Sequence, residues 1–556
     1  MELKKLSKEV AVSPQISVAD LDDIKALGYT SVVCHRPDGE GADQINFDEI
    51  EAAAVKLGLK AIYQPVVSGK INDDDVATFK TTMDEAKGPV FAYCRTGTRC
   101  TTLWSLAKST ELSVTEILSA SKAAGYDMSG VVRRIVNGGH TPIEQTDKKF
   151  DIVVVGAGAA GIAVSASLLE RSPKLSIAII DPADIHYYQP GWTLVGAGVF
   201  TAEQTVKTMS SLIPKNVTWI KNAVAAFEPD NNKVLLDGCH IIEYSHLIVC
   251  PGLKLDWHKI EGLTETLGKN GVTSNYRFDL APYTWELVKE CKEAKAVFTQ
   301  PPMPIKCAGA PQKALYLSCD HWLREGKLKD MKVDFYNAGG VLFGVKEYVP
   351  ALMEYIEKYD ANLHFSQNLV KVDGPNKIAY FQAVGEGAST DLVEVPFDML
   401  HVVPPQSPPD FIAVSPLVDA NGWVDVDQST LQHKKYKNIY SLGDVMNAPN
   451  AKTAAAARMQ APVVAINVMH DLGVGSQRAI YNGYGSCPLT VEKGKIVLAE
   501  FGYGGKLLPT FPTWLVNSKR PSKLAWFLKE KLLPPIYWKA MLKGKEYFAK
   551  PKEYMD

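Results

Sequence analysis

The chain has 556 residues, of which 46% are hydrophobic, and a formal net charge of −2. This length predicts roughly three or four domains, each with enough apolar residues for its own core. The near-neutral charge gives no electrostatic reason to expect nucleic-acid binding, and no apolar run reaches the ~18 to 20 residues of a membrane-spanning helix.

The cysteines and histidines narrow the class of protein further. The nine cysteines are an odd number spread over a long chain, and the N-terminus lacks the apolar segment of a signal peptide. These features predict a reducing, cytoplasmic environment without structural disulfides. The sequence contains no HExxH, HxH or CxxC motif, so we expect no metal site.

Residues 1–110 are predicted to form a small separate α/β domain. Strands are expected at 31–34, 60–65 and 89–93, and helices at 47–57 and 75–86. The last strand runs into CRTGTRC, residues 94–100, and then into a helix that begins near Thr101. Backbone N–H groups and a helix dipole at this position lower the pKa of Cys94 and favour its nucleophilic thiolate. Arg99 would add a planar fork suited to an oxyanion.

This loop has four residues between Cys94 and Arg99, a shorter spacing than in cysteine-dependent phosphatases. Together with Arg36-Pro37-Asp38-Gly39-Glu40, it resembles a family of small proteins related to both phosphatases and rhodanese sulfurtransferases. The resemblance implies that Cys94 carries a persulfide. A phosphatase with Asp38 as general acid, and an unreactive buried Cys94, are the alternatives.

Residues 151–167, DIVVVGAGAAGIAVSAS, predict a strand, a glycine turn and a helix without a gap. Gly156 allows the tight turn, Gly158 lets the backbone approach a pyrophosphate, and Gly161 lets the helix pack on its strand. A second strand at 176–180 ends on Asp181, twenty residues after the last glycine, where a ribose hydroxyl needs an acceptor. The sequence therefore predicts a dinucleotide site; the alternative is a glycine-rich turn in an ordinary α/β domain.

Two later segments indicate which dinucleotide is bound. A strand at 244–249 ends at Cys250-Pro251-Gly252, and a strand near 438–442 ends at Gly443-Asp444, before residues 450–457 enter a helix. The combination of an early glycine fingerprint and a distant strand that ends in Gly-Asp resembles the sequences of FAD-dependent reductases with two dinucleotide-binding domains. The resemblance implies FAD as the cofactor, with contacts from Gly156, Ala157, Gly158, Ala160, Gly161, Asp181, Gln189, Gly252, Gly443, Asp444, Lys452 and Thr453.

The second dinucleotide domain lacks the fingerprint that an NAD(P)H site would need. After the strand at 294–299 the turn reads QPPMPIKCAGAPQK, residues 300–313. Its prolines remove N–H donors and fix φ, so this turn cannot bind a dinucleotide in the usual way. Cys307 stands in the place of a nicotinamide-binding loop.

From about residue 149 to the C-terminus, five segments together resemble the sulfide:quinone oxidoreductase family. They are HYYQPGWTLVGAG at 186–198, KCAGAPQK at 306–313, MLHVVPP at 399–405, GWVDVD at 422–427 and SCPL at 486–489. The resemblance implies that Cys307 receives sulfur from sulfide, that FAD takes the electrons and that membrane quinone reoxidises the flavin. A small thiol or sulfite would accept the sulfur, and a homodimer is left open. The alternative is an FAD-dependent NAD(P)H oxidoreductase or redox sensor fused to a cysteine-dependent phosphatase.

The family resemblance implies a second redox cysteine just after the late Gly-Asp, but this chain has Val445 there. Cys250 is the expected replacement because it ends a strand at the sheet edge; a disulfide would need Cα atoms within about 7 Å. Cys319, in the following helix, and Cys487, in a remote segment before the tail, are expected to contribute little. The alternative is that Cys250 packs as a small apolar residue.

Residues 506–556 carry eleven Lys or Arg against four Asp or Glu, interleaved with tryptophans and leucines. This composition predicts peripheral, monotopic attachment to the cytoplasmic side of a membrane. The alternative is that these short helices pack on the protein's own core or at a dimer interface.

These features predict an α/β architecture in which a phosphatase-like or rhodanese-like domain is fused to a Rossmann-type flavoprotein with a helical tail. The expected boundaries are 1–110 for the first domain, 111–149 for a helical extension and linker, 150–255 and 391–505 for the FAD-binding domain, 256–390 for the second Rossmann-like domain and 506–556 for the tail. Fusion would give Cys94 a roughly millimolar effective concentration of sulfane sulfur, taken directly from Cys307 or through a small persulfide.

Overall fold

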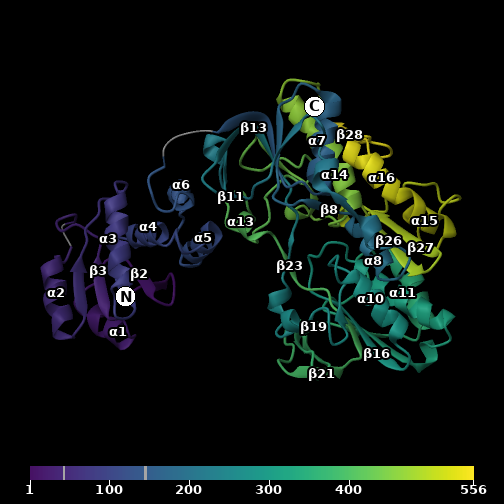
Figure 1. The fold of residues 1–556 in the computed structure, drawn as a ribbon, viewed down its shortest axis with the longest axis horizontal. Coiled ribbons are helices and arrows are strands. Elements are labelled where there is room, and N and C mark those ends of the chain that lie inside the picture. The colour runs from purple at the N-terminus through teal and green to yellow at the C-terminus, as the bar shows by residue number, and fades with distance from the viewer. Residues whose placement is uncertain (42–43, 143–146, 556) are drawn as a thin grey trace. The chain divides into compact units, whose positions relative to one another are not determined.

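The computed structural model describes residues 1–41, 44–142 and 147–555. The chain divides into two compact units, each described here by itself. Unit 1 comprises Met1–Lys149, Asn222–Tyr244 and Asp410–Val418, and unit 2 comprises Phe150–Lys221, Ser245–Pro409 and Asp419–Asp556. Both contain helices and strands (Figure 1), so the predicted α/β class is confirmed. Residues 143–146 of the expected linker lie outside the described part of the chain.

Unit 1 is built on a five-stranded sheet with the order β1-β2-β5-β3-β4. The strands are β1 Lys4–Lys5, β2 Val10–Ser13, β3 Ser31–Cys34, β4 Lys60–Tyr63 and β5 Val90–Tyr93, and all neighbours except β1 and β2 are parallel. Alternate residues of the central strands join two apolar clusters, one with helices α1 (Asp20–Ala26) and α2 (Phe47–Lys56), the other with α3 (Asp73–Asp84) and α4 (Thr98–Ala107). Helices therefore cover both faces of the sheet, as a parallel sheet requires.

The remaining elements of unit 1 are short. Ser113 and Glu116 form a capping box at the start of α5 (Val114–Ala123). Beyond it lie α6 (Val132–Val136), β11 (Val224–Glu228), β12 (Lys233–Leu236) and α13 (Asp410–Ala413). The segment expected as a helical extension and linker thus contains the helices α5 and α6.

The first sheet of unit 2 carries the glycine fingerprint. This seven-stranded sheet has the order β10-β7-β6-β13-β12-β11, and β24 also pairs with β13. Besides β11 and β12, its strands are β10 (Val217–Ile220), β7 (Ile177–Ile180), β6 (Lys148–Val155), β13 (Ile241–Val249) and β24 (Ile439–Ser441). Their pairs β10·β7, β6·β7 and β13·β24 are parallel. Helix α7 (Ala159–Arg171) follows β6 and packs against α14 (Ala454–Asp471), which follows β24. The carboxyl ends of β6 and β24 therefore meet at one edge, which joins the early glycines to the late Gly-Asp.

A second parallel sheet in unit 2 has the order β15-β22-β16-β17-β18. These strands are Val272–Thr273, Met399–His401, Ala294–Gln300, Met331–Asn337 and Asn362–Phe365. The connecting helices are α10 (Ala281–Glu290), α11 (Ala310–Arg324) and α12 (Val349–Lys358). An antiparallel meander of β19 (Gln367–Asp373), β20 (Ile378–Ala383) and β21 (Leu392–Pro396) follows. Smaller elements are β8 (Ile185–Tyr187), β9 (Val206–Thr208), α8 (Trp192–Val195), β14 (Lys254–Leu255), α9 (Leu263–Thr266) and β23 (Gln406–Ser407).

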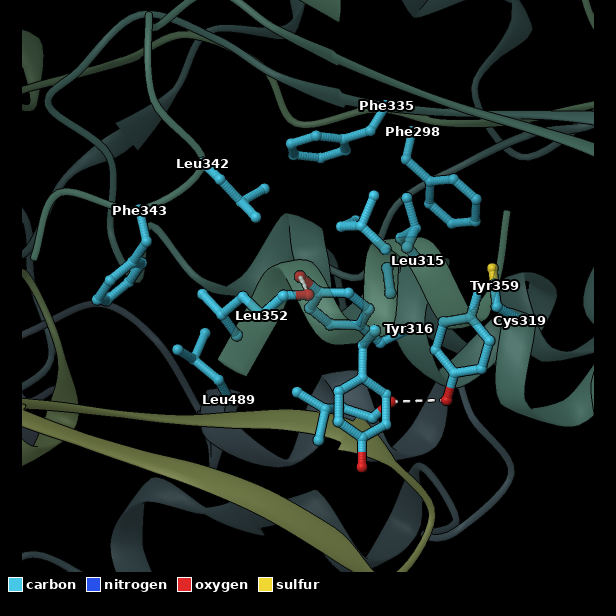
Figure 2. Close-up of a cluster of buried hydrophobic side chains, with 14 of the residues drawn as sticks. Phe298, Leu315, Tyr316, Cys319, Phe335, Leu342, Phe343, Leu352, Tyr359 and Leu489 are labelled. Atoms are coloured by element: carbon cyan, nitrogen blue, oxygen red, sulfur yellow. Dashed lines mark hydrogen bonds between the residues drawn. The ribbon is translucent and has the colours of Figure 1, made fainter. Parts of the chain in front are cut away.

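Helix α11 lies between this second sheet and a C-terminal hairpin of β26 (Gly485–Glu492) and β27 (Lys495–Phe501). Figure 2 shows the core that joins them: Phe298 and Phe335 come from the sheet, Tyr316 from α11 and Leu489 from the hairpin. All four side chains are fully or almost fully buried. This packing fixes β26, which is remote in the sequence, against the start of α11.

After the hairpin the chain forms α15 (Lys523–Phe527), a π-helical turn η11 (Leu528–Leu532), α16 (Leu533–Lys539) and β28 (Glu553–Met555), which pairs with β25 (Arg478–Ile480). Within the described residues, no helix is both long enough and apolar enough to cross a membrane.

Candidate functional site

The glycine turn after β6 has the close contacts that only glycine allows. Gly156 has φ 99°, and a Cβ there would lie 2.7 Å from the Cys250 carbonyl oxygen. A Cβ on Gly161 would lie 1.9 Å from the Gly156 oxygen, so α7 could not approach its strand with any larger residue. Gly158, the N-cap of α7, has open space where its Cβ would be. The first turn of α7 is therefore free to receive an anion.

Acidic groups lie at the same sheet edge. Asp181 follows β7, and its carboxylate accepts hydrogen bonds from the backbone N–H groups of Ala157 at 2.7 Å and Ala183 at 2.8 Å. Asp444 follows β24, and no group in the described part of the chain donates a hydrogen bond to its carboxylate. Burial raises the pKa of Asp444, opposed by the charges of Lys452 and Lys306. A partly buried carboxylate without a donor is suited to a hydroxyl-bearing ligand.

The other predicted cofactor residues fit the same edge. Gly252 and Gly443 have φ of 79° and 81°. Thr453 caps α14, since its hydroxyl accepts a hydrogen bond from the Ala456 N–H at 3.2 Å, and Ala160 lies in the first turn of α7. The Lys452 ammonium donates to the backbone carbonyl oxygen of Asp444, at 2.6 Å, and not to the Asp444 carboxylate. The residues present therefore fit a dinucleotide whose flavin end lies near Asp444 and the N-terminus of α14.

The loop before α11 brings two thiols together. Cys307 Sγ lies 3.7 Å from Cys487 Sγ, and the Lys313 ammonium donates to Cys307 Sγ at 3.3 Å. Cys307 has φ 77°, and Tyr276 donates a hydrogen bond to its carbonyl oxygen at 3.3 Å. A Cβ on Gly309 would lie 2.5 Å from Cys487 Sγ, so this glycine makes room for the partner thiol. The arrangement is a dithiol with a cation at one sulfur.

The dithiol lies next to the predicted flavin edge. An isolated parallel bridge pairs the backbones of Lys306 and Lys452, which places the residue before Cys307 beside the Asp444 loop. The Lys306 ammonium donates to the Gln189 side-chain oxygen at 2.8 Å. Burial lowers the pKa of Lys306 to about 8, opposed by Asp444 and Cys307. The thiols and the cofactor residues therefore form one site.

The two thiols have opposite electrostatic tendencies. A hydrogen bond from Cys487 lowers the pKa of Cys307 well below its usual value against the effect of burial, and the charges of Lys313 and Lys529 lower it further. The hydrogen bond to Cys307, together with burial, raises the pKa of Cys487. Cys307 is therefore the thiolate of the pair and Cys487 the protonated thiol.

The structure brings Cys487, and not the expected Cys250, to the sulfur of Cys307. Cys250 is buried beneath the glycine turn, with its thiol 3.6 Å from the Gly156 oxygen, and burial raises its pKa. Its small side chain packs between the glycine turn after β6 and the start of α7. Cys319 points into the core around α11 (Figure 2), away from the dithiol. Cys487 was expected to lie in a remote segment and to contribute little, but the hairpin carries it to Cys307.

Unit 1 contains the second reactive cysteine. The Gly97 N–H donates to Cys94 Sγ at 3.1 Å, and Gly97, with φ 88°, is the N-cap of α4. A hydrogen bond from the Cys100 thiol lowers the pKa of Cys94 to about 5 against the effect of burial, with backbone N–H groups of Cys100, Thr96 and Arg99 adding to the shift. These hydrogen bonds favour the thiolate of Cys94.

Two acidic residues decide what this loop can bind. Arg99 donates to both oxygens of Glu40, at 2.9 and 2.7 Å, and to the Val66 carbonyl at 2.9 Å. The Asp38 carboxylate accepts a hydrogen bond from the Phe47 N–H, the first of α2, at 3.0 Å. The fork of Arg99 is thus paired with a carboxylate, and the suggested general acid is engaged elsewhere.

The tail is divided between buried and exposed apolar residues. Trp514 is 84% exposed and Phe527 50%, and Leu515, Leu524 and Leu532 are also exposed. Other residues expected on a membrane face are buried against the protein, namely Trp526, Tyr537, Trp538, Met541 and Leu542. Tyr537 shares a hydrogen bond of 2.7 Å with His186. The alternative of packing on the protein's own core therefore holds for this part of the tail.

Three residues of the site escaped prediction from the sequence: Cys487, Lys313 and Glu40. Lys313 lay within the quoted KCAGAPQK segment, six residues after Cys307, where a first helical turn can point back to it. Cys487 lay within the quoted SCPL segment, but its approach depends on the hairpin. Glu40 lay within the quoted RPDGE segment without a sign of its ion pair.

Two family models match the chain. The Beta-lactamase hydrolase-like protein, phosphatase-like domain, matches residues 2–111, and Pyridine nucleotide-disulphide oxidoreductase matches residues 150–300.

Similar proteins cover the two parts separately. The mitochondrial sulfide:quinone oxidoreductase of Dictyostelium discoideum is 43% identical over 404 residues, which cover 72% of this chain and 87% of that protein. The beta-lactamase hydrolase-like protein of Agrobacterium fabrum is 30% identical over 135 residues, which cover 24% of this chain and only 31% of that protein. The solved sulfide:quinone oxidoreductase of Aquifex aeolicus covers 72% of this chain and 92% of its own, with a TM-score of 0.60 and 19% identity, which shows a shared fold.

Proposed function

The chain belongs to the sulfide:quinone oxidoreductase family, as its sequence predicted, and from this premise we propose that it oxidises sulfide at the Cys307–Cys487 pair and passes the electrons to a quinone. The observation that carries this proposal is the 3.7 Å approach of the two thiols, with Lys313 on Cys307, beside the cofactor edge. The alternative of an NAD(P)H oxidoreductase or redox sensor is not favoured, because the relatives that cover most of the flavoprotein part are sulfide:quinone oxidoreductases.

FAD is the cofactor, and when bound it supplies a two-electron acceptor. The first turn of α7 would hold its pyrophosphate, Asp181 its adenosine ribose, and Asp444 with the N-terminus of α14 its flavin end. Gly158, whose Cβ position is open, keeps a side chain out of this space, and the glycines at 156 and 161 let the backbone pack closely behind it.

The charge pattern assigns separate roles to the two sulfurs. In the oxidised pair, hydrosulfide would form a bond to Cys487 Sγ while the Cys307–Cys487 bond breaks, leaving a persulfide on Cys487 and a thiolate on Cys307. Cys307 is the better leaving group because its pKa is lowered, and the Lys313 ammonium holds the thiolate. This differs from the expectation that sulfide sulfur adds to Cys307. A small thiol or sulfite would then remove the outer sulfur from Cys487, which leaves both cysteines reduced. The Cys307–Cys487 bond would re-form as the two sulfurs lose two electrons, which bound FAD accepts and passes to the quinone.

One experiment tests this function. Anaerobic addition of sulfide to the purified yellow protein should bleach the flavin absorbance, and a soluble quinone should restore it. NADH under the same conditions should leave the flavin oxidised. Bleaching by NADH and not by sulfide would overturn the proposal in favour of the reductase alternative.

For the N-terminal domain we infer transfer of sulfane sulfur through Cys94. The Cys94 thiolate would bond to the outer sulfur of a small persulfide, while the bond from that sulfur to its carrier thiol breaks and the thiol leaves. The low pKa of Cys94 supports this role. A phosphatase role is weaker, because the Glu40 carboxylate faces Arg99 and Asp38 accepts a hydrogen bond from the Phe47 N–H. A phosphate dianion needs a free guanidinium group, but the guanidinium of Arg99 is already paired with the Glu40 carboxylate.

We also propose peripheral attachment of the protein to a membrane through the exposed part of the tail, on the cytoplasmic side. Trp514, Leu515, Leu524, Phe527 and Leu532 supply apolar contacts, and the surrounding lysines favour anionic lipid by about 1 kcal/mol each. The nine free cysteines suit a reducing compartment.

Replacing Trp514 and Phe527 together with serine should weaken co-sedimentation with anionic lipid vesicles by at least tenfold, since each side chain contributes roughly 1.5 to 3 kcal/mol when buried. Turnover with a soluble quinone should persist. Leu392→Ser is the matched control, because Leu392 is 47% exposed and lies in β21, outside the tail. Unchanged sedimentation of the double variant would contradict the attachment. Truncation is a poorer test, because it also removes buried residues such as Tyr537.

A further inference from the structure

The tail buries one cation whose charge acts on both thiols of the site. Lys529 lies in the π-helical turn η11 and is only 4% exposed, whereas Phe527 and Leu532 on either side of it are 50% and 42% exposed. In the part of the chain that the structure describes, no group forms a hydrogen bond or an ion pair with the Lys529 ammonium. A single short segment therefore has apolar side chains on its surface and an unpaired charge in its interior.

The packing of the tail explains this position. Helix α15 packs on β27, and the apolar cluster that it joins includes Leu317 of α11 and Leu498 of β27. These elements also build the thiol site, because α11 carries Lys313, and β26, the partner of β27, carries Cys487. Lys529 is thus brought to the thiols by the same scaffold that brings the thiols together.

The charges around Lys529 are all groups of the thiol site. Burial lowers the pKa of Lys529 to about 7, repulsion from Lys313 adds to the shift, and Cys307 and Cys487 oppose it. Lys529 in turn contributes to the lowered pKa of Cys307. Burying an ammonium group without a partner is costly unless an anion arrives to pair with it.

We propose that Lys529 is a sulfur-binding residue, which holds the anionic sulfur of hydrosulfide, and then of the persulfide on Cys487, opposite the Lys313–Cys307 pair. The proposal rests on the proposed function of that pair. It makes the tail a component of the sulfur site as well as the carrier of the exposed apolar residues. Arginine can serve at this position and an apolar side chain cannot.

The test compares Lys529→Met with Lys529→Arg and with Lys531→Met, which removes the same charge from the exposed side of the same turn. In anaerobic mixing with sulfide, Lys529→Met should need about tenfold more sulfide to reach half of its maximal rate of flavin bleaching. Alkylation of Cys307 by iodoacetamide should shift its pH midpoint upward by about one unit. Lys529→Arg should keep most of both properties, and Lys531→Met should behave as the unsubstituted protein.

Thermal unfolding separates this role from a structural one. Removing an unpaired buried charge should leave the melting temperature unchanged or raise it, so Lys529→Met should be stable and impaired. Unchanged sulfide dependence together with an unchanged alkylation profile in Lys529→Met would overturn the proposal. If sulfide does not bleach the flavin of the unsubstituted protein, the proposed function is overturned instead. The pH dependence of Cys307 alkylation would then still decide the role of Lys529.

Discussion

Replacing Cys487 with serine should slow sulfide-dependent flavin bleaching by about 10³-fold or more, as expected when one member of a catalytic pair is removed. The serine hydroxyl has a size close to that of the thiol, so β26 and its contact with Gly309 should survive. It can form neither the bond to Cys307 nor a persulfide. The measurement is rapid anaerobic mixing with sulfide, with FAD content as a check on folding.

The matched controls are the buried cysteines that do not touch Cys307. Cys250→Ala removes a thiol that packs against the Gly156 oxygen, and Cys319→Ala removes one from the core around α11. Both should keep sulfide-dependent bleaching within a few-fold of the unsubstituted protein, with some loss of stability from the cavities left behind. A Cys250→Ala protein without activity but with full FAD content, beside an active Cys487→Ser protein, would restore the pairing expected from the sequence.

The cofactor edge could be predicted because its determinants are local. The glycines at 156, 158 and 161 and the acid at 181 lie within one βαβ unit, so a strand, a turn and a helix read in order define their geometry. The late Gly-Asp was found by resemblance, and the parallel pairing of β13 with β24 places it at the same edge.

The partner of Cys307 could not be predicted because its position is a tertiary property. Cys487 is 180 residues away and reaches Cys307 only because the β26–β27 hairpin packs on α11. The strand end before Cys250 predicts a position at the sheet edge, but the tight glycine turn after β6 covers its thiol. A strand end predicts the edge of a sheet and not the direction of the side chain.

The tail shows a related limit. Its composition predicts an amphipathic surface, and Trp514 and Phe527 are exposed. The sequence could not divide its aromatic residues between surface and interior, since Tyr537 and Trp538 are buried against residues of the segment after β7. Short helices interrupted by prolines lack the regular 3.6-residue spacing of apolar residues that would predict which face is buried.

Replacing Cys94 with serine should abolish transfer of sulfur from thiosulfate to cyanide, because the other cysteine of this segment, Cys100, is fully buried and burial raises its pKa. In the unsubstituted protein, ionisation of Cys94 should leave the transfer rate constant between pH 6 and pH 8. The rate should fall as the pH drops through about 5, since protonation removes the thiolate. An ordinary thiol with a pKa near 8.5 would lose roughly two orders of magnitude of thiolate between pH 8 and pH 6. Cys100→Ala removes the hydrogen bond that lowers the pKa and should move the fall to higher pH.

Cys34→Ala is the matched control for this experiment, because Cys34 is buried at the end of the neighbouring strand β3 and donates to the Arg36 carbonyl oxygen instead of to Cys94. Its transfer activity should be retained. Hydrolysis of p-nitrophenyl phosphate distinguishes the remaining alternative: the unsubstituted protein should show none, because Glu40 occupies the Arg99 fork and Asp38 is bound to the Phe47 N–H. Hydrolysis that depends on Cys94, in a protein without sulfur transfer, would contradict the sulfur-carrying role and identify the domain as a phosphatase.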